Sequence, residues 1–404
     1  MDHDRCFWNF YSPGRLVFGS GAVRHLGQLI EPFRPKRILL ISDPQLDRAG
    51  IVSKVIGPIS EAGYSVHVCL DGEPEPTFTT ADRVLAAARH YHPNMVVAIG
   101  GGSNMDLGKV AAAVLTHGGN YRDYVNYGKV PGPLMPLICI PTTAGTGSEV
   151  SHAAVLTDPE KHLKVSILSQ YLRPAVALVD PELTLSCPPQ ATADSGIDAL
   201  THAIEAYTST DYDKLDVPVS EPFAYGGKQP LGDVIAERAI KLIGRNLVTA
   251  VKQPDNLAAR EGMALGATLA GLAFSNCAVA AVHALEYPIG GAVHVSHGAG
   301  NGLLLPYVMR YNLPARPKEF ARIAAFLGEN VAGLTYEAAA ERSVAAVERL
   351  RREVGIPERL RDIGVQREQL PEFAKKAFGI TRLMLLNARR PTEADLLEIL
   401  EAAW

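Results

Sequence analysis

The sequence predicts an α/β N-terminal domain with a parallel sheet, followed by an all-α C-terminal domain. Three observations support this fold class. At 404 residues the chain is too long for one typical hydrophobic core. Short β-branched runs alternate with helical patterns from Lys36 to about Leu185, and the strand signal fades after Pro188–Pro189. We therefore expect two domains, residues 1–189 and residues 190–404.

Five short apolar segments in the first domain are expected to form buried strands. Each is rich in β-branched and aliphatic residues, which is typical of strands in a parallel sheet that is covered on both faces. The segments are KRILLISD (36–43), YSVHVCL (64–70), MVVAIGG (95–101), LMPLICIPTT (134–143) and AVALVDP (175–181). Between the second and the third, ADRVLAAARHY (81–91) has the apolar spacing of an amphipathic helix.

The second domain has a helical pattern nearly throughout, as in 236–251 and 335–354. The segment 210–233 is dense in proline, glycine and aspartate and is predicted to be a loop insertion. Such a loop is either tolerated at the surface or placed at the rim of an active site. Residues 263–282 carry no charge, but they are rich in alanine and glycine and interrupted at Ser275–Asn276, which favours a core helix over a membrane span.

Composition and charge narrow the class of protein. A net charge of −4 provides no basic field, so neither nucleic acid nor an anionic membrane is expected as a partner. The N-terminal segment MDHDRCFWNFY lacks the apolar stretch of a signal peptide. The cysteines form no C-x-x-C pair, which favours reduced thiols and a cytoplasmic location. They are Cys6, Cys69, Cys139, Cys187 and Cys277.

Four residues of the second domain form a candidate metal site. Asp198 and His202 are four residues apart in an expected helix, so both side chains leave the same face. His283 and His297 flank the segment PIGG, which we expect to be a turn that returns both histidines to that face. One carboxylate and three imidazoles suit Fe(II) or Zn(II). Each half alone is also typical of a capping pair or a hydrogen-bonded core histidine, but their combination favours a metal site.

A glycine-rich turn in the first domain is a candidate nucleotide site. In AIGGGSNMDLGKVAAAV (98–114), a strand, three glycines and a helix follow one another. Glycines let the backbone approach a ligand, and the positive end of the helix attracts a pyrophosphate. The turn also has a purely structural interpretation, because it is neither G-x-G-x-x-G nor a P-loop. A second loop, PTTAGTGSE (141–149), follows a strand and suits a ribose–phosphate.

Asp43 ends the expected strand KRILLISD. A carboxylate at this place can accept hydrogen bonds from an adenosine ribose and repel a 2′-phosphate, which favours NAD over NADP. An aspartate before Pro44 is also a common turn starter.

Five motifs together resemble those of the iron-containing (group III) alcohol dehydrogenases: GGGSNMD, PTTAGTGSE, LVDPELT, DSGIDALTHAIEAY and HALEYPIGG…SHG, in this order. The resemblance covers nearly the whole chain. It implies a dinucleotide-binding α/β domain, a helical metal-binding domain and an active-site cleft between them. It also implies NAD(H), a homodimer or larger homo-oligomer, and iron or sometimes zinc on Asp198, His202, His283 and His297. The residues at the family's cofactor positions are Asp43, Gly101, Gly102, Ser103, Asp106, Thr142, Thr143, Thr146 and Lys164.

The chain departs from the family pattern at one position. Many members have a second histidine four residues after the third metal ligand, and here that position is Tyr287. A tyrosine there, together with the insertion at 210–233, is similar to the hydroxyacid–oxoacid transhydrogenase branch. The proton carrier is therefore open among Tyr287, His294 and metal-bound water. Phe274 either lines the pocket or is a core aromatic.

We predict an alcohol dehydrogenase or aldehyde reductase that transfers hydride reversibly between a primary alcohol and NAD(H). The metal is expected to act as a Lewis acid, with His283, His297, Tyr287 and His294 in the catalytic site. The runner-up is a transhydrogenase with retained NAD, whose acidic substrates would need a cation such as Lys214 or Lys228. A lyase of the dehydroquinate-synthase type and a non-catalytic binder are further alternatives.

Overall fold

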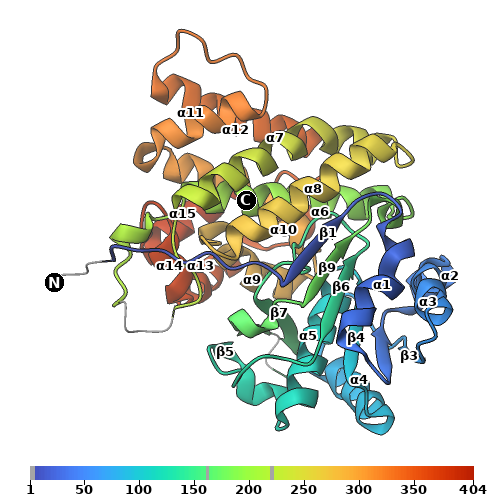
Figure 1. Ribbon diagram of the computed structural model, residues 1–404. Helices are drawn as coiled ribbons and strands as arrows, with labels where there is room; N and C mark the ends of the chain where they lie inside the picture. Colours follow the sequence, from blue (N-terminus) through green and yellow to red (C-terminus); the bar gives the residue numbers. More distant parts are fainter. Residues whose placement is uncertain (1–4, 161–162, 219–222) are drawn as a thin grey trace. The chain divides into compact units, whose positions relative to one another are not determined.

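The computed structural model describes residues 5–160, 163–218 and 223–404. These residues form two compact units (Figure 1). One is Tyr11–Cys187, and the other contains Pro188–Trp404 together with the N-terminal segment that ends at Phe10. The predicted first domain began at residue 1, but the described residues up to Phe10 group with the helical unit. There the Arg5 side chain donates to the Val217 carbonyl oxygen at 3.1 Å.

The first unit is built on a six-stranded, wholly parallel sheet with the strand order β1-β9-β6-β4-β2-β3. Alternate residues of β2 pack into different cores: Leu39 and Ile41 belong to one cluster, and Ile38 and Leu40 to the other. This period of two, with both faces covered, confirms the predicted parallel sheet. The strands are β1 (Arg15–Phe18), β2 (Ile38–Ile41), β3 (Val66–Cys69), β4 (Met95–Gly100), β6 (Leu137–Pro141) and β9 (Val176–Val179).

Helices cover both faces of this sheet. Residues of α4 and α5 belong to the cluster of Leu39, and residues of α1 and α3 to the cluster of Leu40. The α-helices are α1 (Leu26–Ile30), α2 (Pro44–Arg48), α3 (Ile51–Glu61), α4 (Phe78–Tyr91) and α5 (Gly102–His117). The 3₁₀ helices are η1 (Ala22–His25), η2 (Glu31–Phe33), η3 (Tyr121–Tyr124), η4 (Gln170–Leu172) and η5 (Pro181–Thr184).

A second, smaller sheet of the first unit was not predicted from the sequence. It has the order β5-β8-β7, from β5 (Asn126–Tyr127), β7 (Ala153–Asp158) and β8 (Leu163–Leu168). β7 and β8 are antiparallel neighbours. In β7, buried and half-buried residues alternate, as expected for a strand with one covered face.

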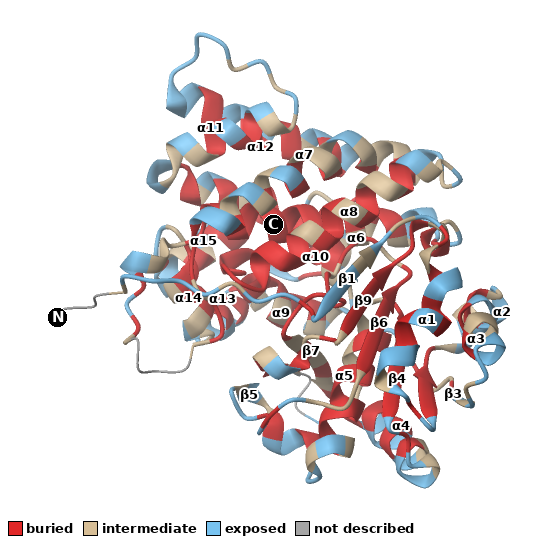
Figure 2. Cartoon of the chain, viewed as in Figure 1, coloured by how far each residue is buried: buried red, intermediate tan, exposed pale blue. Residues whose placement is uncertain are grey.

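The secondary-structure elements assigned among the described residues of the second unit are all helices, and Figure 2 shows α6, α8 and α10 buried along most of their length. The α-helices are α6 (Pro189–Thr208), α7 (Pro230–Lys252), α8 (Leu257–Phe274), α9 (Ala281–Val293), α10 (His297–Asn312), α11 (Pro317–Phe326), α12 (Tyr336–Glu353), α13 (Leu370–Phe378), α14 (Thr381–Leu386) and α15 (Glu393–Ala403). The 3₁₀ helices are η6 (Tyr212–Lys214), η7 (Leu313–Ala315), η8 (Leu360–Ile363) and η9 (Arg367–Gln369).

Two predictions made from the sequence of the second unit were wrong. The insertion does not extend to residue 233, because α7 begins at Pro230; the Gln229 side chain accepts from the Leu231 amide at 2.9 Å, and proline is favoured at a first helical position. Part of the predicted insertion, 219–222, lies outside the described residues. The PIGG segment is not a turn either. It lies inside α9, and the chain turns only at His294, whose φ is 55°.

The apolar core segment 263–282 is divided at the interruption noted at Ser275–Asn276, because α8 ends at Phe274 and α9 begins at Ala281. At the break, the Asn276 side chain donates to the Leu272 carbonyl oxygen at 2.8 Å. Across the part of the chain that the structure describes, no helix combines the length and the apolar character needed to cross a membrane.

Candidate functional site

Three of the four predicted metal ligands form a buried cluster in the helical unit. The candidate ligand atoms of Asp198, His202 and His283 all lie within 4.8 Å of one another. The His202 Nδ1 is 3.9 Å from one Asp198 oxygen, and the His283 Nε2 is 4.0 Å from the other. These separations are too long for hydrogen bonds. They suit ligands that share one cation, since atoms at about 2.0–2.2 Å from a metal lie roughly 3–4 Å apart.

His297, the fourth predicted ligand, lies beside this cluster. It is the first residue of α10, and its ring centroid is 5.4 Å from that of His283. The Nδ2 atom of Asn301 lies 3.1 Å from the His297 Nε2 and donates to the Asp198 carboxylate at 2.8 Å. Asn301 therefore ties His297 to the cluster, and ligation by His297 remains a prediction.

Two buried glutamates that sequence reasoning missed orient the histidines. The Glu205 carboxylate lies 2.6 Å from the His283 Nδ1, and the Glu286 carboxylate is hydrogen-bonded to the His297 Nδ1. When Nδ1 donates to a carboxylate, Nε2 keeps its lone pair for a metal. The buried His283 Nε2 has no hydrogen-bond partner among the described residues, which fits a metal ligand. Glu205 could have been found, because it follows Asp198 by two helical turns.

Glu205 also fixes the backbone that carries His283. Its two oxygens accept from the Ala280 amide at 2.9 Å and the Val282 amide at 2.8 Å, at the start of α9. Unpaired amides and the positive dipole end at a helix start favour a carboxylate there. One side chain thus positions both the ring and the main chain of a ligand.

The charge of the cluster also fits a divalent cation. Asp198, Glu205 and Glu286 are all buried, and isolated carboxylates are costly to bury. Burial opposes the ionisation of Asp198, but the neighbouring imidazoles of His202, His297 and His283, with the Asn301 amide, hold its pKa below the ordinary value. A group of buried carboxylates with histidines is the donor set that iron or zinc binds.

The other residues predicted for catalysis occupy different environments. The Tyr287 ring stacks against His297, with centroids 6.0 Å apart, and burial raises the pKa of Tyr287 to about 12. The phenol is therefore a hydrogen-bond donor near neutral pH, not a base. His294 is exposed at the end of α9. Phe274 stacks on His202 at 4.2 Å between centroids, so it supports a ligand ring.

In the first unit, the two loops predicted for nucleotide binding meet at the ends of β4 and β6. The Thr142 amide donates to the carbonyl oxygen of the last residue of β4 at 2.9 Å. A Cβ on Gly102 would be 2.8 Å from the Thr146 side chain, and one on Gly101 would be 3.7 Å from that of Thr143. The structure therefore brings these predicted cofactor residues together, and Gly102 is required for the close approach.

Asp106 braces the second loop. Its carboxylate accepts from the Ser148 hydroxyl at 2.7 Å and from the Val155 amide at 2.9 Å. Lys109, which the sequence analysis did not single out, is fully buried and donates to Ser148 at 2.9 Å and to the Ala153 carbonyl oxygen at 2.7 Å. Both side chains shape the loop, and contact of Asp106 with a cofactor remains a prediction.

Asp43 and Lys164 are both engaged by protein groups. Asp43 caps α2, and one carboxylate oxygen accepts from the Gln45 and Leu46 amides at 2.8 and 3.0 Å. The Lys164 ammonium lies 2.9 Å from the Glu75 carboxylate. The Glu75 amide, in a residue with a φ of 51°, donates to the Ser103 hydroxyl at 3.2 Å.

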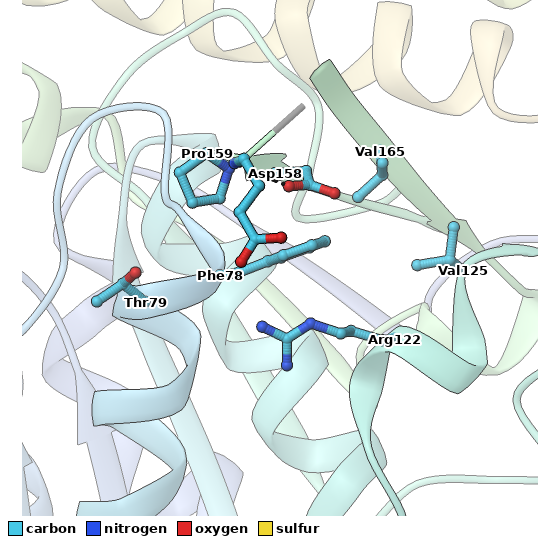
Figure 3. A pocket seen from close by; sticks show the side chains of 8 residues that line it. Phe78, Thr79, Arg122, Val125, Asp158, Pro159 and Val165 are labelled. Atoms are coloured by element: carbon cyan, nitrogen blue, oxygen red, sulfur yellow. Dashed lines mark hydrogen bonds between the residues drawn. The ribbon is translucent and has the colours of Figure 1, made fainter. Parts of the chain in front are cut away.

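A separate cavity of about 370 Å³ in the first unit contains none of the predicted site residues. The Arg122 guanidinium lies 4.6 Å from the centre of the Phe78 ring (Figure 3). Asp158, Pro159 and Glu160 line the cavity next to residues that the structure does not describe.

A parallel α/β unit with a glycine turn, and a helical unit with a buried Asp–His–His cluster, are the two parts that the resemblance to the iron-containing alcohol dehydrogenases implies. Two family models match the chain: "Iron-containing alcohol dehydrogenase" over residues 13–181, and "Fe-containing alcohol dehydrogenase family, C-terminal" over residues 217–404. The chain therefore belongs to the iron-containing alcohol dehydrogenases, and the predicted family, fold and enzyme class are confirmed.

Individual relatives agree over almost the full length. The long-chain-alcohol dehydrogenase 1 of Geobacillus thermodenitrificans (strain NG80-2) is 40% identical, over 97% of each chain. The NAD-dependent methanol dehydrogenase of Bacillus methanolicus is 36% identical, over 98% of this chain and 99% of the relative. The crystal structure of a 1,3-propanediol oxidoreductase superposes with a TM-score of 0.91 at 38% identity and covers 98% of this chain and 100% of that chain.

Proposed function

We propose that this protein catalyses reversible hydride transfer between a primary alcohol and NAD(H), with Fe(II) or Zn(II) on Asp198, His202, His283 and His297. The observation that carries the proposal is the buried cluster, in which Glu205 directs His283 toward Asp198. The relatives include alcohol, methanol and 1,3-propanediol dehydrogenases and a lactaldehyde reductase, which supports the predicted interconversion of alcohols and aldehydes. One of these relatives is named as NAD-dependent, in agreement with the predicted NAD(H).

The protein groups around the cluster prepare it for this chemistry. When bound, a divalent metal supplies Lewis acidity that lowers the pKa of a substrate hydroxyl. Glu205 and Glu286 hold the imidazole rings in position, and Phe274 supports the His202 ring from one face. The protonated Tyr287 hydroxyl is suited to donate a hydrogen bond to a substrate oxygen. Tyr287, His294 and water remain the candidates for carrying the proton to solvent.

The dinucleotide is proposed to bind at the loops of the first unit. Parallel sheets bind their ligands outside the carboxyl ends of the strands, and the two loops follow β4 and β6 there. The residues proposed to contact the cofactor are Asp43, Gly101, Gly102, Ser103, Asp106, Thr142, Thr143, Thr146 and Lys164. Amides at the start of α5 are suited to a pyrophosphate.

The hydroxyacid–oxoacid transhydrogenase is not favoured. The predicted cations for its acidic substrates are both paired with carboxylates: Lys214 lies 3.1 Å from Asp211, and Lys228 is bonded to Asp233. The relatives reported above are named for alcohols or, in one case, for lactaldehyde.

We also propose a homo-oligomer in the cytoplasm. Leu16 and Phe18 of the edge strand β1 are 40% and 37% exposed, which suits an interface with a second copy. The buried Cys69, Cys139 and Cys277 are thiols, which suits a reducing compartment.

The test of the metal assignment is His283→Ala. The variant is expected to lose bound metal and turnover but to keep its helical content, as measured by metal analysis, NADH oxidation with an aldehyde panel, and circular dichroism. His90→Ala removes an exposed histidine of α4 and is the matched control. Unchanged metal content and turnover in His283→Ala would reject the assignment. Including oxoacids in the panel, with Fe(II), Zn(II) or chelator, separates the dehydrogenase from the transhydrogenase.

A further inference from the structure

Asn104, in the first turn of α5, connects the ends of two strands. It is only 2% exposed. Its Nδ2 atom donates both to the Asp43 carboxylate, at 2.8 Å, and to the Ile99 carbonyl oxygen, at 3.0 Å. Both hydrogens of the amide group are therefore used, one at the end of β2 and one near the end of β4.

Two glycines make the space that this amide occupies. A Cβ on Gly72, after β3, would lie 2.1 Å from the Asn104 Oδ1. A Cβ on Gly100, the last residue of β4, would lie 2.2 Å from the Asn104 Nδ2. The Gly72 amide is itself bonded to the Ser42 carbonyl oxygen at 3.0 Å. The Asn104 amide is thus enclosed where the carboxyl ends of β2, β3 and β4 meet.

This arrangement fixes the orientation of Asp43. One carboxylate oxygen is held by the two backbone amides of α2, and the other accepts from Asn104. An ionised carboxylate oxygen has two lone-pair sites, so the oxygen on Asn104 retains one for a ribose hydroxyl. If Asp43 turned away to admit a 2′-phosphate, it would leave a buried Asn104 N–H without its acceptor, which is costly.

We propose that Asn104 is a positioning residue that sets the preference for NAD over NADP by holding the Asp43 carboxylate in place. The inference rests on the proposed role of Asp43 in the nucleotide site. Two effects would then disfavour NADP. The Asp43 carboxylate repels the 2′-phosphate, and Asp43 must break its hydrogen bond with Asn104 to admit that group.

The test is the ratio of the Kd for NADPH to the Kd for NADH, measured by fluorescence titration of the full-length protein. Asn104→Ala is expected to lower this ratio about tenfold, the effect of losing one hydrogen bond to a charged group. A residue that is only structural would weaken both cofactors alike, so an unchanged ratio overturns the proposal. Asn246→Ala removes a side-chain bond to the Leu242 carbonyl oxygen in the other unit and is the control.

Two further variants distinguish a failure of this inference from a folding defect and from a wrong assignment of Asp43. Asn104→Ser retains a small polar group but is too short to reach Asp43, and it replaces the alanine variant if that one does not fold. Asp43→Gly tests the underlying role: if it leaves the ratio unchanged, the proposed function of Asp43 is wrong. If Asp43→Gly lowers the ratio and the Asn104 variants do not, only the present inference is wrong. In the double variant, Asn104→Ala should add no further change to the ratio.

Discussion

The Glu205 carboxylate positions both a ligand side chain and the backbone that carries it at the candidate metal centre. Glu205 sets the ring of His283 through its Nδ1 and the main chain of α9 through two amides. A histidine whose Nδ1 donates to a buried carboxylate is a stronger and better oriented ligand. The orientation of His283, in α9, therefore depends on Glu205, in α6.

Glu205→Gln is expected to lower metal affinity about 10- to 100-fold, since outer carboxylates contribute this much at such sites. The amide also replaces one acceptor of the α9 amides, so the melting temperature should fall. Metal affinity is measured by competition with a chelator. Glu353→Gln, at an exposed position of α12, is the control, and equal affinities of the two variants would contradict the prediction.

At the scale of elements, the close packing of α6 against α10 places Asp198. A Cβ on Gly302 of α10 would lie 2.6 Å from the Ile197 side chain, next to Asp198 in α6. Such an overlap forces backbone shifts, because Ile197 is fully buried. The separation of the two helices therefore depends on this glycine.

Gly302→Ala is expected to reduce the free energy of unfolding by about 1–3 kcal/mol and to weaken metal binding, because α6 must move. Urea unfolding and chelator competition measure the two effects. Gly57→Ala is the control for adding a Cβ to a helix, since a Cβ there meets nothing within 4 Å beyond its own chain neighbours. Stability equal to that of the unsubstituted protein would show that the helices adjust without cost.

The insertion is attached to α11 by an ion pair that responds to pH. Asp211 lies 3.0 Å from Arg316, and the Arg316 guanidinium also donates to the Ser209 carbonyl oxygen at 2.7 Å. Burial raises the pKa of Asp211, but the bonds and charges of Arg316 and Lys214 outweigh it and hold the pKa below its ordinary value. A carboxyl with a lowered folded-state pKa stabilises the fold above its unfolded pKa, and this contribution disappears as pH falls through the folded pKa.

Asp211→Asn is expected to cost about 0.5–1 kcal/mol of unfolding free energy at pH 7, a value reduced by partial solvent exposure. The difference in unfolding free energy between the variant and the unsubstituted protein should shrink below about pH 4, where the aspartate becomes protonated in the unfolded chain. Denaturant unfolding across this range measures it. Asp213→Asn, at an exposed position of the same segment, is the control, and a pH-independent difference would refute the linkage.

At the scale of the whole molecule, the two candidate sites belong to different compact units. A ligand stabilises the unit to which it binds, so added metal and added NADH should slow amide hydrogen exchange in different peptides. Zn(II) is expected to protect α6, α9 and the start of α10, whereas NADH is expected to protect 98–106 and 141–149. Protection by Zn(II) confined to residues 11–187 would contradict this assignment.

The local patterns of the sequence were sufficient for much of this protein. Aliphatic runs between turns predicted β2, β4, β6 and β9, because a strand buried on both faces must be apolar along its length. The half-exposed edge strand β3 was predicted from its alternating valines. The spacing of Asp198 and His202 predicted their common face, because α6 is a regular helix. Short or half-exposed strands such as β1 and β7 carry little local signal and were missed.

By itself, the sequence determined the parallel sheet, the helical second unit, the family, and the residue types of both candidate sites, because these follow from periodicity and short motifs. Only the tertiary structure decided that PIGG is helical and that Glu205 and Asn104 hold His283 and Asp43. These features depend on contacts between residues far apart in the chain. Such contacts form only when packed elements bring buried hydrogen-bonding groups together, and no local pattern records them.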